Sequence, residues 1–449
     1  MRVTVEIQSL DAEGAGVGLA GEDALEVHVP GTAPGDRILA QVQHVSPHKV
    51  NGQKRAWAQL ISIERASPER QTPACAAFGQ CGGCAVAHVS IARQEQWKHA
   101  QLVASLGTAG VAASVIAPVI ASPRSEGYRN QSKLVVGRER SGNTVLGAYA
   151  PRSHDVVDTA GCALVEPPLQ HVADTLRRLV FSMGITPYDE TTGGGELRYV
   201  VLRANHREEV LVTLVVPAEG PRIVELAVEL MSLHPEVVGV IANLNSQPGD
   251  ALMGSVEKVI AGVGVLQEAI LNTTLTLSSR TFFQVNRGVA AALYEAVRER
   301  VKEFAERQST PVVMAEVYAG VGVIASELQP LAAQVIAIEN NPAVSAHYPP
   351  ERGITLAEAD AAIGLSQVAE AGVVVLNPPR AGCEGAVLAQ VLRLRPGLLC
   401  YVSCNPKSLA RDLRVLQAGG YRVMQVLPFD MMPHTPHVET LVFLTPGDA

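Results

Sequence analysis

Residues 311–322 read PVVMAEVYAGVG, and this stretch decides the fold of the C-terminal part of the chain. The run VVMAEV is apolar enough for a strand that is buried on both faces, and the glycines after it allow a tight turn into a helix. Further strands of this buried type follow at residues 333–339, 372–376 and 398–404, and helical segments alternate with them. The alternation predicts an α/β fold with an open, mostly parallel, doubly wound sheet over residues 276–449.

Polar residues stand where these strands end, which is where ligands bind in such sheets. Gly320 lies in the first strand–helix turn, and Glu339 ends the next strand nineteen residues later. An acid at that place can accept hydrogen bonds from a ribose diol, but no third glycine completes a dinucleotide fingerprint. Asp360 follows a further strand. Together these features suit S-adenosylmethionine, which has no pyrophosphate, although each acid taken singly is also explained as a solvated carboxylate.

Three more residues at strand ends are of types that can take part in binding or catalysis. Asn377 precedes two prolines, so a rigid backbone holds it in the crevice. Cys404 ends the strand LLCYVS just before a helix N-terminus, which can lower the pKa of a thiol and suits a nucleophile. Glu439 lies beside two histidines before an apolar strand and is a candidate general base. The structural alternatives are a buried cysteine, as we expect for Cys400, and an ordinary strand-end carboxylate.

A cluster of cysteines indicates a metal site. Cys75, Cys81 and Cys84 lie within ten residues, and Cys162 is the other cysteine far from the C-terminal motifs. Four thiolates suit either zinc or an iron–sulfur cluster, and the spacing alone leaves the two about even; His88 is an alternative fourth ligand. The chain has 7 cysteines and no secretory signal at its N-terminus, so we expect reduced thiols in the cytoplasm.

The rest of the chain divides into two parts. Residues 1–66 read as short strands separated by glycine turns, which predicts a small OB-type β-barrel, a fold that often binds RNA. Residues 67–275 hold the cysteines, a helix through residues 91–106 and an α+β domain, with residues 93–124 expected to pack on the C-terminal domain. The uncharged stretch 100–123 is long enough for a membrane span, but its Gly, Pro and Ala content favours a helix end and a loop, and no membrane partner.

The composition of the chain excludes two classes of protein. Hydrophobic residues make up 47% of the 449 residues and charged residues 18%, which excludes a disordered chain. The net charge of 36 − 44 = −8 excludes a protein that coats nucleic acid through bulk charge. Residues 71–150, however, hold seven Lys/Arg against three Asp/Glu, or 7 − 3 = +4, so the remainder carries −8 − 4 = −12. A local surface for a polyanion is therefore compatible with the overall charge.

The motifs together resemble the S-adenosylmethionine-dependent RNA (uracil-5-)-methyltransferase family. Within it, the chain is similar to the bacterial 23S rRNA uridine methyltransferases that carry an N-terminal TRAM domain and an iron–sulfur cluster. The similarity covers nearly the whole chain. It rests on CAAFGQCGGC from residue 75, YRN from residue 128, FFQVN from residue 282, YVSCNPKSLARD from residue 401 and DMMPHTPHVE from residue 430.

The resemblance implies a Rossmann-like class I methyltransferase domain and assigns roles to residues. It places a [4Fe-4S] cluster on Cys75, Cys81, Cys84 and Cys162. It places the cofactor, S-adenosylmethionine, at Gln284, Tyr318, Gly320, Glu339, Asp360 and Asn377. Cys404 falls on the nucleophile and Glu439 on the base. The partner it implies is RNA, most specifically 23S rRNA, and we expect a cytoplasmic monomer.

The chemistry explains why these residue types are needed. Carbon 5 of uracil is too weak a nucleophile to take a methyl group from sulfur, and attack of the Cys404 thiolate on carbon 6 generates an enolate that activates it. Glu439 then removes the proton of carbon 5, which expels Cys404 and restores the aromatic ring. A target base inside folded RNA has to be flipped out to reach these groups.

The chain departs from the family pattern in places. Asn377 replaces a common Asp, Val323 replaces a common Asn, and the segment between Glu339 and Asp360, which contains HYPPERG, is short enough to predict a reduced helix. Three alternative functions remain. The first is the same reaction on tRNA. The second is RNA cytosine-5 methylation, which the absence of a cysteine directly after the Asn-Pro-Pro motif disfavours. The third is a non-catalytic iron–sulfur RNA-binding protein, which the presence of both a nucleophile and a base disfavours.

Overall fold

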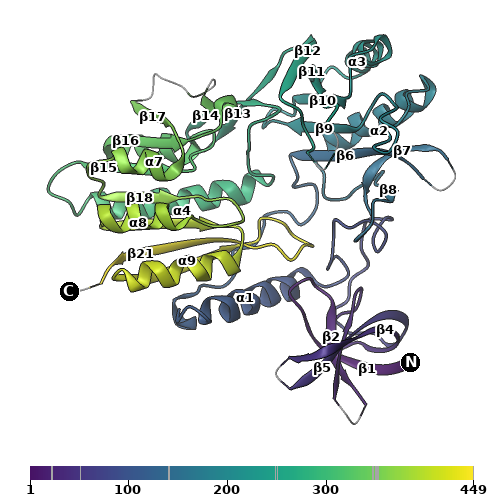
Figure 1. The fold of residues 1–449 in the computed structure, drawn as a ribbon, viewed down its shortest axis with the longest axis horizontal. Coiled ribbons are helices and arrows are strands. Elements are labelled where there is room, and N and C mark those ends of the chain that lie inside the picture. The colour runs from purple at the N-terminus through teal and green to yellow at the C-terminus, as the bar shows by residue number, and fades with distance from the viewer. Residues whose placement is uncertain are drawn as a thin grey trace.

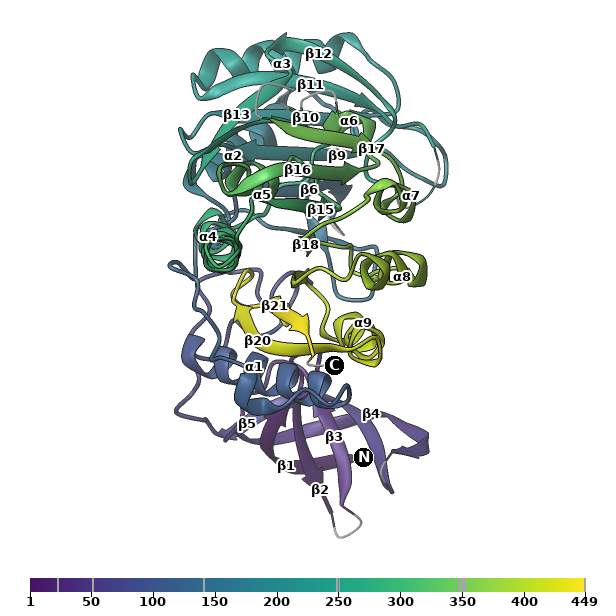
Figure 2. The ribbon, with the colours of Figure 1, turned by 90° about the vertical axis from the view of Figure 1, so that its left-hand side faces the viewer.

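A computed structural model describes residues 1–21, 24–50, 52–139, 142–247, 249, 251–345, 348 and 353–447. The chain forms three successive parts: a closed β-barrel, a mixed sheet with two helices, and a larger sheet with helices on both faces (Figure 1). Figure 2 shows the barrel at one end of the view and the mixed sheet at the other, and Figure 1 shows the larger sheet to one side of both.

The N-terminal barrel closes in the order β1-β2-β3-β5-β4. Its strands are β1 (Arg2–Leu10), β2 (Gly16–Ala20), β3 (Leu25–Val29), β4 (Arg37–Val50) and β5 (Gln53–Arg65). The predicted OB-like barrel is confirmed, but β2 lies in a run of glycines that the sequence assigned to turns. Gly18 explains the difference, because a Cβ there would lie 2.2 Å from the carbonyl oxygen of Glu6 on the paired strand.

The helix predicted after the cysteines is α1 (Ile91–Gly107). Its buried side chains include Trp97, Leu102 and Leu106, and it packs beside α9 of the C-terminal sheet, between that sheet and the barrel (Figures 1 and 2). The short helix η1 (Ala113–Val115) follows, and the chain then runs along the outer edge of β20. Among the described residues, no helix is both long and apolar enough to cross a membrane.

The central sheet has the order β12-β11-β10-β9-β6-β7-β8. Its strands are β6 (Gln131–Arg138), β7 (Thr144–Tyr149), β8 (Val156–Asp158), β9 (Tyr199–Ala204), β10 (Val210–Val216), β11 (Val237–Leu244) and β12 (Val256–Gly262). The helices α2 (Pro167–Ser182) and α3 (Pro221–Leu233) bury their apolar faces in one core with β9 and β10. The α+β fold that the sequence predicts for this part of the chain is confirmed.

A hairpin follows, made of β13 (Val265–Ile270) and β14 (Thr273–Ser278). Its side chains Leu266, Leu275 and Leu277 are buried in the same core as helix α4 of the C-terminal sheet. The hairpin therefore packs with the C-terminal part of the molecule, although most of it precedes residue 276.

The C-terminal sheet has the order β17-β16-β15-β18-β19-β21-β20. Its strands are β15 (Val312–Val317), β16 (Ala332–Glu339), β17 (Ile354–Glu358), β18 (Val373–Leu376), β19 (Leu398–Ser403), β20 (Tyr421–Phe429) and β21 (Glu439–Pro446). The first five strands in space are parallel, and β21 alone is reversed, because it pairs antiparallel with both β19 and β20. The predicted open, mostly parallel sheet is confirmed.

Helices cover both faces of this sheet (Figure 2). On one face lie α4 (Arg287–Ala305), α5 (Val323–Leu328) and the short helix η2 (Gln329–Leu331). On the other lie α7 (Ala361–Gln367), α8 (Gly385–Leu394) and α9 (Pro406–Ala418). The described part of α6 covers only Pro342–Ser345, and most of the HYPPERG segment lies outside the described residues. The parallel strands bring their carboxyl ends to one edge, which is where the predicted site residues lie.

Candidate active site

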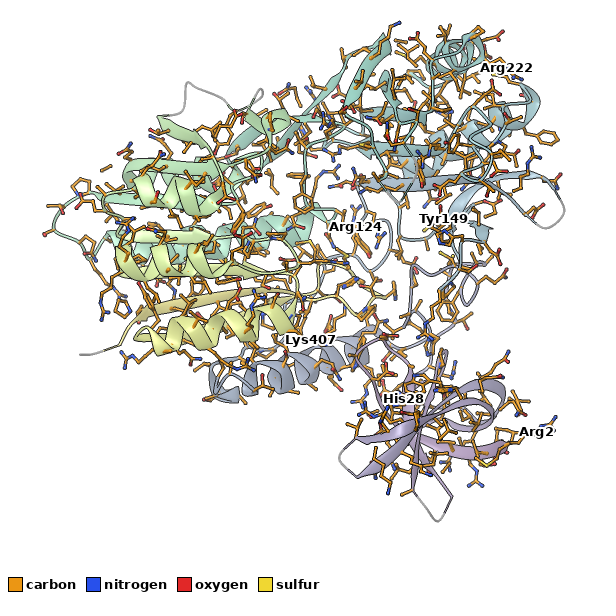
Figure 3. The ribbon with its side chains drawn as sticks, in the orientation of Figure 1. Arg2, His28, Arg124, Tyr149, Arg222 and Lys407 are labelled. Carbon is orange, nitrogen blue, oxygen red and sulfur yellow. The ribbon has the colours of Figure 1, made fainter. Side chains whose placement is uncertain are left out.

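Antiparallel pairing brings Cys404 and Glu439 together. Ser403, the last residue of β19, is paired with Thr440 on β21. Extending this register by one residue places Cys404 opposite Glu439, although 35 positions separate them in the sequence. Figure 3 marks Lys407 in the first turn of α9, the helix that begins directly after Cys404. The predicted nucleophile and the predicted base therefore lie opposite each other at the end of the sheet.

Burial controls the acid–base properties of this pair. Glu439 is only 5% exposed, and burial raises its pKa to about 8, against the pull of the Arg380 charge. Burial and then the Glu439 charge raise the pKa of the Cys404 thiol, while Arg380 lowers it. The lowered thiol pKa expected from the helix N-terminus is therefore wrong, because desolvation and a neighbouring carboxylate raise the pKa instead. The first turn of the helix is itself capped, since the Asn405 side chain accepts a hydrogen bond from the Lys407 amide.

Arg380 is a site residue that the sequence interpretation missed. Its Nη2 lies 3.2 Å from Nε2 of His437 on the loop that leads to Glu439. Its carbonyl oxygen accepts hydrogen bonds from Asn405 Nδ2 at 3.0 Å and Ser408 Oγ at 3.1 Å, which ties the loop after β18 to the start of α9. The available signal was its position directly after Asn-Pro-Pro at the end of the neighbouring strand.

The turn after β15 has the geometry of a ligand-binding loop. The backbone is left-handed at Tyr318 (φ 61°) and at Gly320 (φ 52°). The carboxylate of Glu339 holds this turn, because Oε2 accepts a hydrogen bond from the Gly320 amide at 2.9 Å. Its Oε1 accepts from the amides of Asn340 and Asn341. Glu339 thus shapes the turn, in addition to standing where the sequence placed a ribose acceptor.

The other predicted cofactor residues lie at the same edge of the sheet or beside it. Asp360 follows β17 and caps α7 by accepting a hydrogen bond from Ala362 at 3.0 Å. Asn377 follows β18, and its amide donates to the carbonyl oxygen of Val317 on β15. Gln284 is buried in the segment between β14 and α4, where its carbonyl oxygen accepts from Asn130 Nδ2 at 2.9 Å.

A second buried acid was also missed. Glu316 lies in the middle of the apolar strand β15, is only 1% exposed, and accepts a hydrogen bond from the Ala325 amide at 2.7 Å. Burial raises its pKa to about 8. The signal in the sequence was the single carboxylate inside the run VVMAEV, directly before the ligand-binding turn.

Comparison with known proteins identifies the family. Residues 360–446 match the family model described as tRNA (uracil-5-)-methyltransferase. The chain is 32% identical to an uncharacterised RNA methyltransferase of Halalkalibacterium halodurans, over 98% of this chain and 96% of that one. The identity is 33% with an uncharacterised RNA methyltransferase of Geobacter sulfurreducens, over 98% and 89%. The chain belongs to the S-adenosylmethionine-dependent RNA (uracil-5-)-methyltransferase family.

A solved structure shows the same fold. The crystal structure of the Pyrococcus abyssi tRNA (uracil-54, C5)-methyltransferase in complex with S-adenosyl-L-homocysteine superposes with a TM-score of 0.75 at 24% identity. The match covers 98% of this chain and 100% of the other. This match confirms the fold of the methyltransferase, while the family model and the curated relatives confirm the family and the enzyme class inferred from the sequence.

The four predicted metal cysteines of the methyltransferase line one cavity. Cys75, Cys81, Cys84 and Cys162 are free thiols on its wall. Burial raises the pKa of Cys84 to about 12, with the Cys162 charge adding to it. Within the part of the chain that the structure describes, no three His, Cys, Asp or Glu side chains form a group that could hold a metal ion. The ligand set therefore stays a prediction.

The backbone holds the two cysteine segments in place. The Gly82 amide donates to the carbonyl oxygen of Tyr149 at 3.1 Å, at the end of β7 (labelled in Figure 3). Residues 127–129 run beside residues 163–166, directly after Cys162. The alternative ligand His88 points toward the barrel, where its Nε2 lies 3.0 Å from the carbonyl oxygen of Thr32.

Proposed function

We propose that this enzyme transfers a methyl group from S-adenosylmethionine to carbon 5 of a uridine in 23S rRNA. The observation that carries the reaction is the register of β19 and β21, which ends at Ser403 and Thr440 and so places Cys404 opposite Glu439, with a carboxyl pKa of about 8. A thiol and a carboxyl group held opposite each other suit addition to one face of a pyrimidine and removal of a proton from the adjacent carbon.

The protein groups divide the work as follows. The Cys404 thiolate adds to carbon 6, and the electron pair of the 5,6 double bond moves toward the carbonyl oxygen at carbon 4. S-adenosylmethionine supplies the electrophilic methyl group when bound. Glu439 takes the proton from carbon 5, the double bond re-forms, and the thiolate leaves. Arg380 lowers the pKa of both groups, so its charge favours the thiolate before addition and the carboxylate before proton removal.

We propose that the crevice around Gly320 holds S-adenosylmethionine. The residues are those that the sequence assigned to the cofactor: Gln284, Tyr318, Gly320, Glu339, Asp360 and Asn377. The left-handed turn and its hydrogen bond to Glu339 support this proposal, because they expose backbone and an acid at the end of two neighbouring parallel strands. Asn377 keeps a polar amide where an acid is common, so it offers both a donor and an acceptor without charge.

We propose that the cysteine cavity holds a [4Fe-4S] cluster. Four free thiols from two segments on one wall fit a four-thiolate donor set. Four thiolates also suit a zinc ion, and the family resemblance favours the cluster. Gly83 also fits, because a Cβ there would lie 3.4 Å from the Cys81 sulfur.

We propose that the parts of the chain keep the predicted roles: a TRAM-like RNA-binding barrel (1–66), an iron–sulfur and α+β domain (67–275) and a methyltransferase domain (276–449). An aromatic platform on the barrel supports its RNA-binding role. Trp57 is 37% exposed, and its ring lies 5.6 Å from that of His28 (labelled in Figure 3) and 5.8 Å from that of His44. The same β4–β5 hairpin carries Lys49 and Lys54, so it combines a stacking surface with positive charge.

The second candidate substrate is tRNA, which the description of the matching family model favours. Mapping of 5-methyluridine by mass spectrometry in rRNA and tRNA from a deletion strain separates the two. We expect one or more 5-methyluridines to disappear from 23S rRNA and to return when the gene is restored. Loss from tRNA alone would transfer the proposal to tRNA, and an unchanged pattern in both would contradict it.

A further inference from the structure

Arg129 is partly buried beside four cysteines. It lines the same cavity as Cys75, Cys81, Cys84 and Cys162. Its Nε is buried and has no hydrogen-bond partner among the described residues. An unpaired guanidinium nitrogen in a buried place is costly unless something fills the space beside it. The orphaned donor therefore points to an anionic group in this cavity.

The backbone around Arg129 leaves the side chain little freedom. The Arg129 amide donates to Leu164 O at 2.8 Å, and its carbonyl oxygen accepts from the Glu166 amide at 3.0 Å. Its neighbours are fixed as well, since Tyr128 donates through its hydroxyl to Pro433 O at 3.1 Å and the Asn130 amide donates to Val285 O at 3.0 Å. The three residues of the YRN motif thus contact three different segments of the chain, and Arg129 is the one that lines the cysteine cavity.

We propose that Arg129 is the charge partner of the cluster thiolates and raises the reduction potential of the cluster. This inference rests on the [4Fe-4S] cluster proposed above. Four thiolates carry four formal negative charges in a partly desolvated cavity, and a one-electron reduction adds another. A fixed positive charge on the cavity wall stabilises the reduced state more than the oxidised state, and local charge is one of the main controls of such potentials.

This role of Arg129 also changes the contribution to RNA binding that is expected from the basic segment 71–150. From the sequence, Arg129 and Lys133 are candidates for the RNA surface, and neutralising both is expected to weaken RNA binding and its salt dependence. On this proposal the guanidinium charge is engaged by the thiolates, so it contributes little to phosphate contacts. We therefore expect the salt dependence of RNA binding to be insensitive to Arg129.

The test uses the full-length protein, purified anaerobically with its cluster, and three variants. Arg129→Gln removes the charge and Arg129→Lys keeps it. Arg177→Gln is the matched control, because Arg177 lines the same cavity but is paired with Asp158 and Asp174. The measurements are iron and sulfide content, the midpoint potential from a titration followed by electron paramagnetic resonance, and the rate at which the visible absorbance bleaches in air.

We expect Arg129→Gln to shift the midpoint potential to more negative values and to bleach several-fold faster, whereas Arg129→Lys and Arg177→Gln stay near the wild type. If Arg129→Gln folds without iron, the presence of iron in Arg129→Lys supports the role of the charge. The absence of iron from both variants overturns that role. An unchanged potential in a fully loaded Arg129→Gln variant overturns the inference and leaves the cluster intact. A wild-type protein that binds no iron overturns the cluster and the inference together.

Discussion

The ammonium of Lys98 lies 2.6 Å from the carboxylate of Asp430, 332 residues further along the chain, and both side chains are fully buried. Lys98 also donates to the carbonyl oxygen of Met432. One turn earlier on the same helix, Gln94 Oε1 accepts from the His434 amide at 2.8 Å and Gln94 Nε2 donates to Val86 O at 3.0 Å. Helix α1 therefore holds both the segment after the cysteine motif and the loop that leads to Glu439.

Loss of the Lys98 charge should destabilise the enzyme strongly. Lys98→Met leaves the Asp430 carboxylate buried without a cation. The Oδ2 atom of Asp430 already has no hydrogen-bond partner among the described residues. Breaking a buried pair in this way costs about 3–5 kcal/mol, which we expect as a loss of unfolding free energy in urea titrations. Lys258→Met is the control, since its pair with Glu219 is exposed and is worth at most about 1 kcal/mol. Equal losses in the two variants would contradict the role of the buried pair.

Cys404 should form a covalent adduct with RNA that contains 5-fluorouridine, because fluorine cannot leave carbon 5 as a proton does. We expect a slowly migrating protein–RNA band on a denaturing gel with the wild type and no band with Cys404→Ala. Cys400→Ala is the matched control, because Cys400 lies on the same strand but is fully buried, and burial raises its pKa to about 12. An adduct that survives Cys404→Ala would reject Cys404 as the nucleophile.

Glu439 should act after methyl transfer. In Glu439→Gln we expect the thiol adduct to persist on a natural uridine and product release to slow by about 10²–10⁴-fold, the usual contribution of a general base. The rate of product release should also depend on pH, since only the ionised carboxylate accepts a proton. With a pKa of about 8, the ionised fraction rises as the pH rises through 8. Single-turnover release should therefore increase over this range in the wild type and be flat in Glu439→Gln. A variant with normal release would contradict the assignment.

The same pKa shift has a consequence for stability. A carboxyl whose pKa is raised in the folded state holds a proton that the unfolded chain has already lost, so the unfolded state binds fewer protons between about pH 4.5 and 8. Stability should therefore fall as the pH rises through this window. Glu316 adds to the slope, because burial raises its pKa to about 8 as well. We expect Glu316→Gln to flatten the dependence of the thermal midpoint on pH. An unchanged slope would contradict the buried, protonated state of Glu316.

The parts of the site that the sequence predicted are those set by local patterns. Runs such as 312–317 and 398–403 are buried strands, and parallel strands end at one edge, so Gly320, Asn377 and Cys404 could be placed together. Properties that depend on distant partners could not be predicted. The thiol pKa of Cys404 depends on Glu439, 35 residues away, and nothing near Arg129 in the sequence indicates that it faces the cysteines.

The barrel also has a feature that depends on residues far apart in the sequence. Its strands could be recognised, except for β2, but not the contacts of the Trp57 ring with His28, which stacks on it, and with His44, which is tilted against it. The two histidines come from two other strands. Stacking of a base on an exposed aromatic ring is worth about 1–3 kcal/mol. We therefore expect Trp57→Ala to weaken RNA binding by roughly 5–150-fold, whereas Trp57→Phe retains most of the affinity.

The salt dependence separates stacking from charge at this platform. Trp57→Ala removes no cation, so the slope of log affinity against log salt should stay unchanged in fluorescence-anisotropy titrations. The double variant Lys49→Gln/Lys54→Gln should instead reduce the slope by about 1.4, since each phosphate contact to a single strand contributes roughly 0.7. Arg37→Gln is the control for a barrel cation that is engaged elsewhere, because Arg37 pairs with Glu64 at 3.1 Å. If all four variants bind RNA as the wild type does, the β4–β5 hairpin is not part of the RNA surface, and the barrel contacts RNA through another face or not at all.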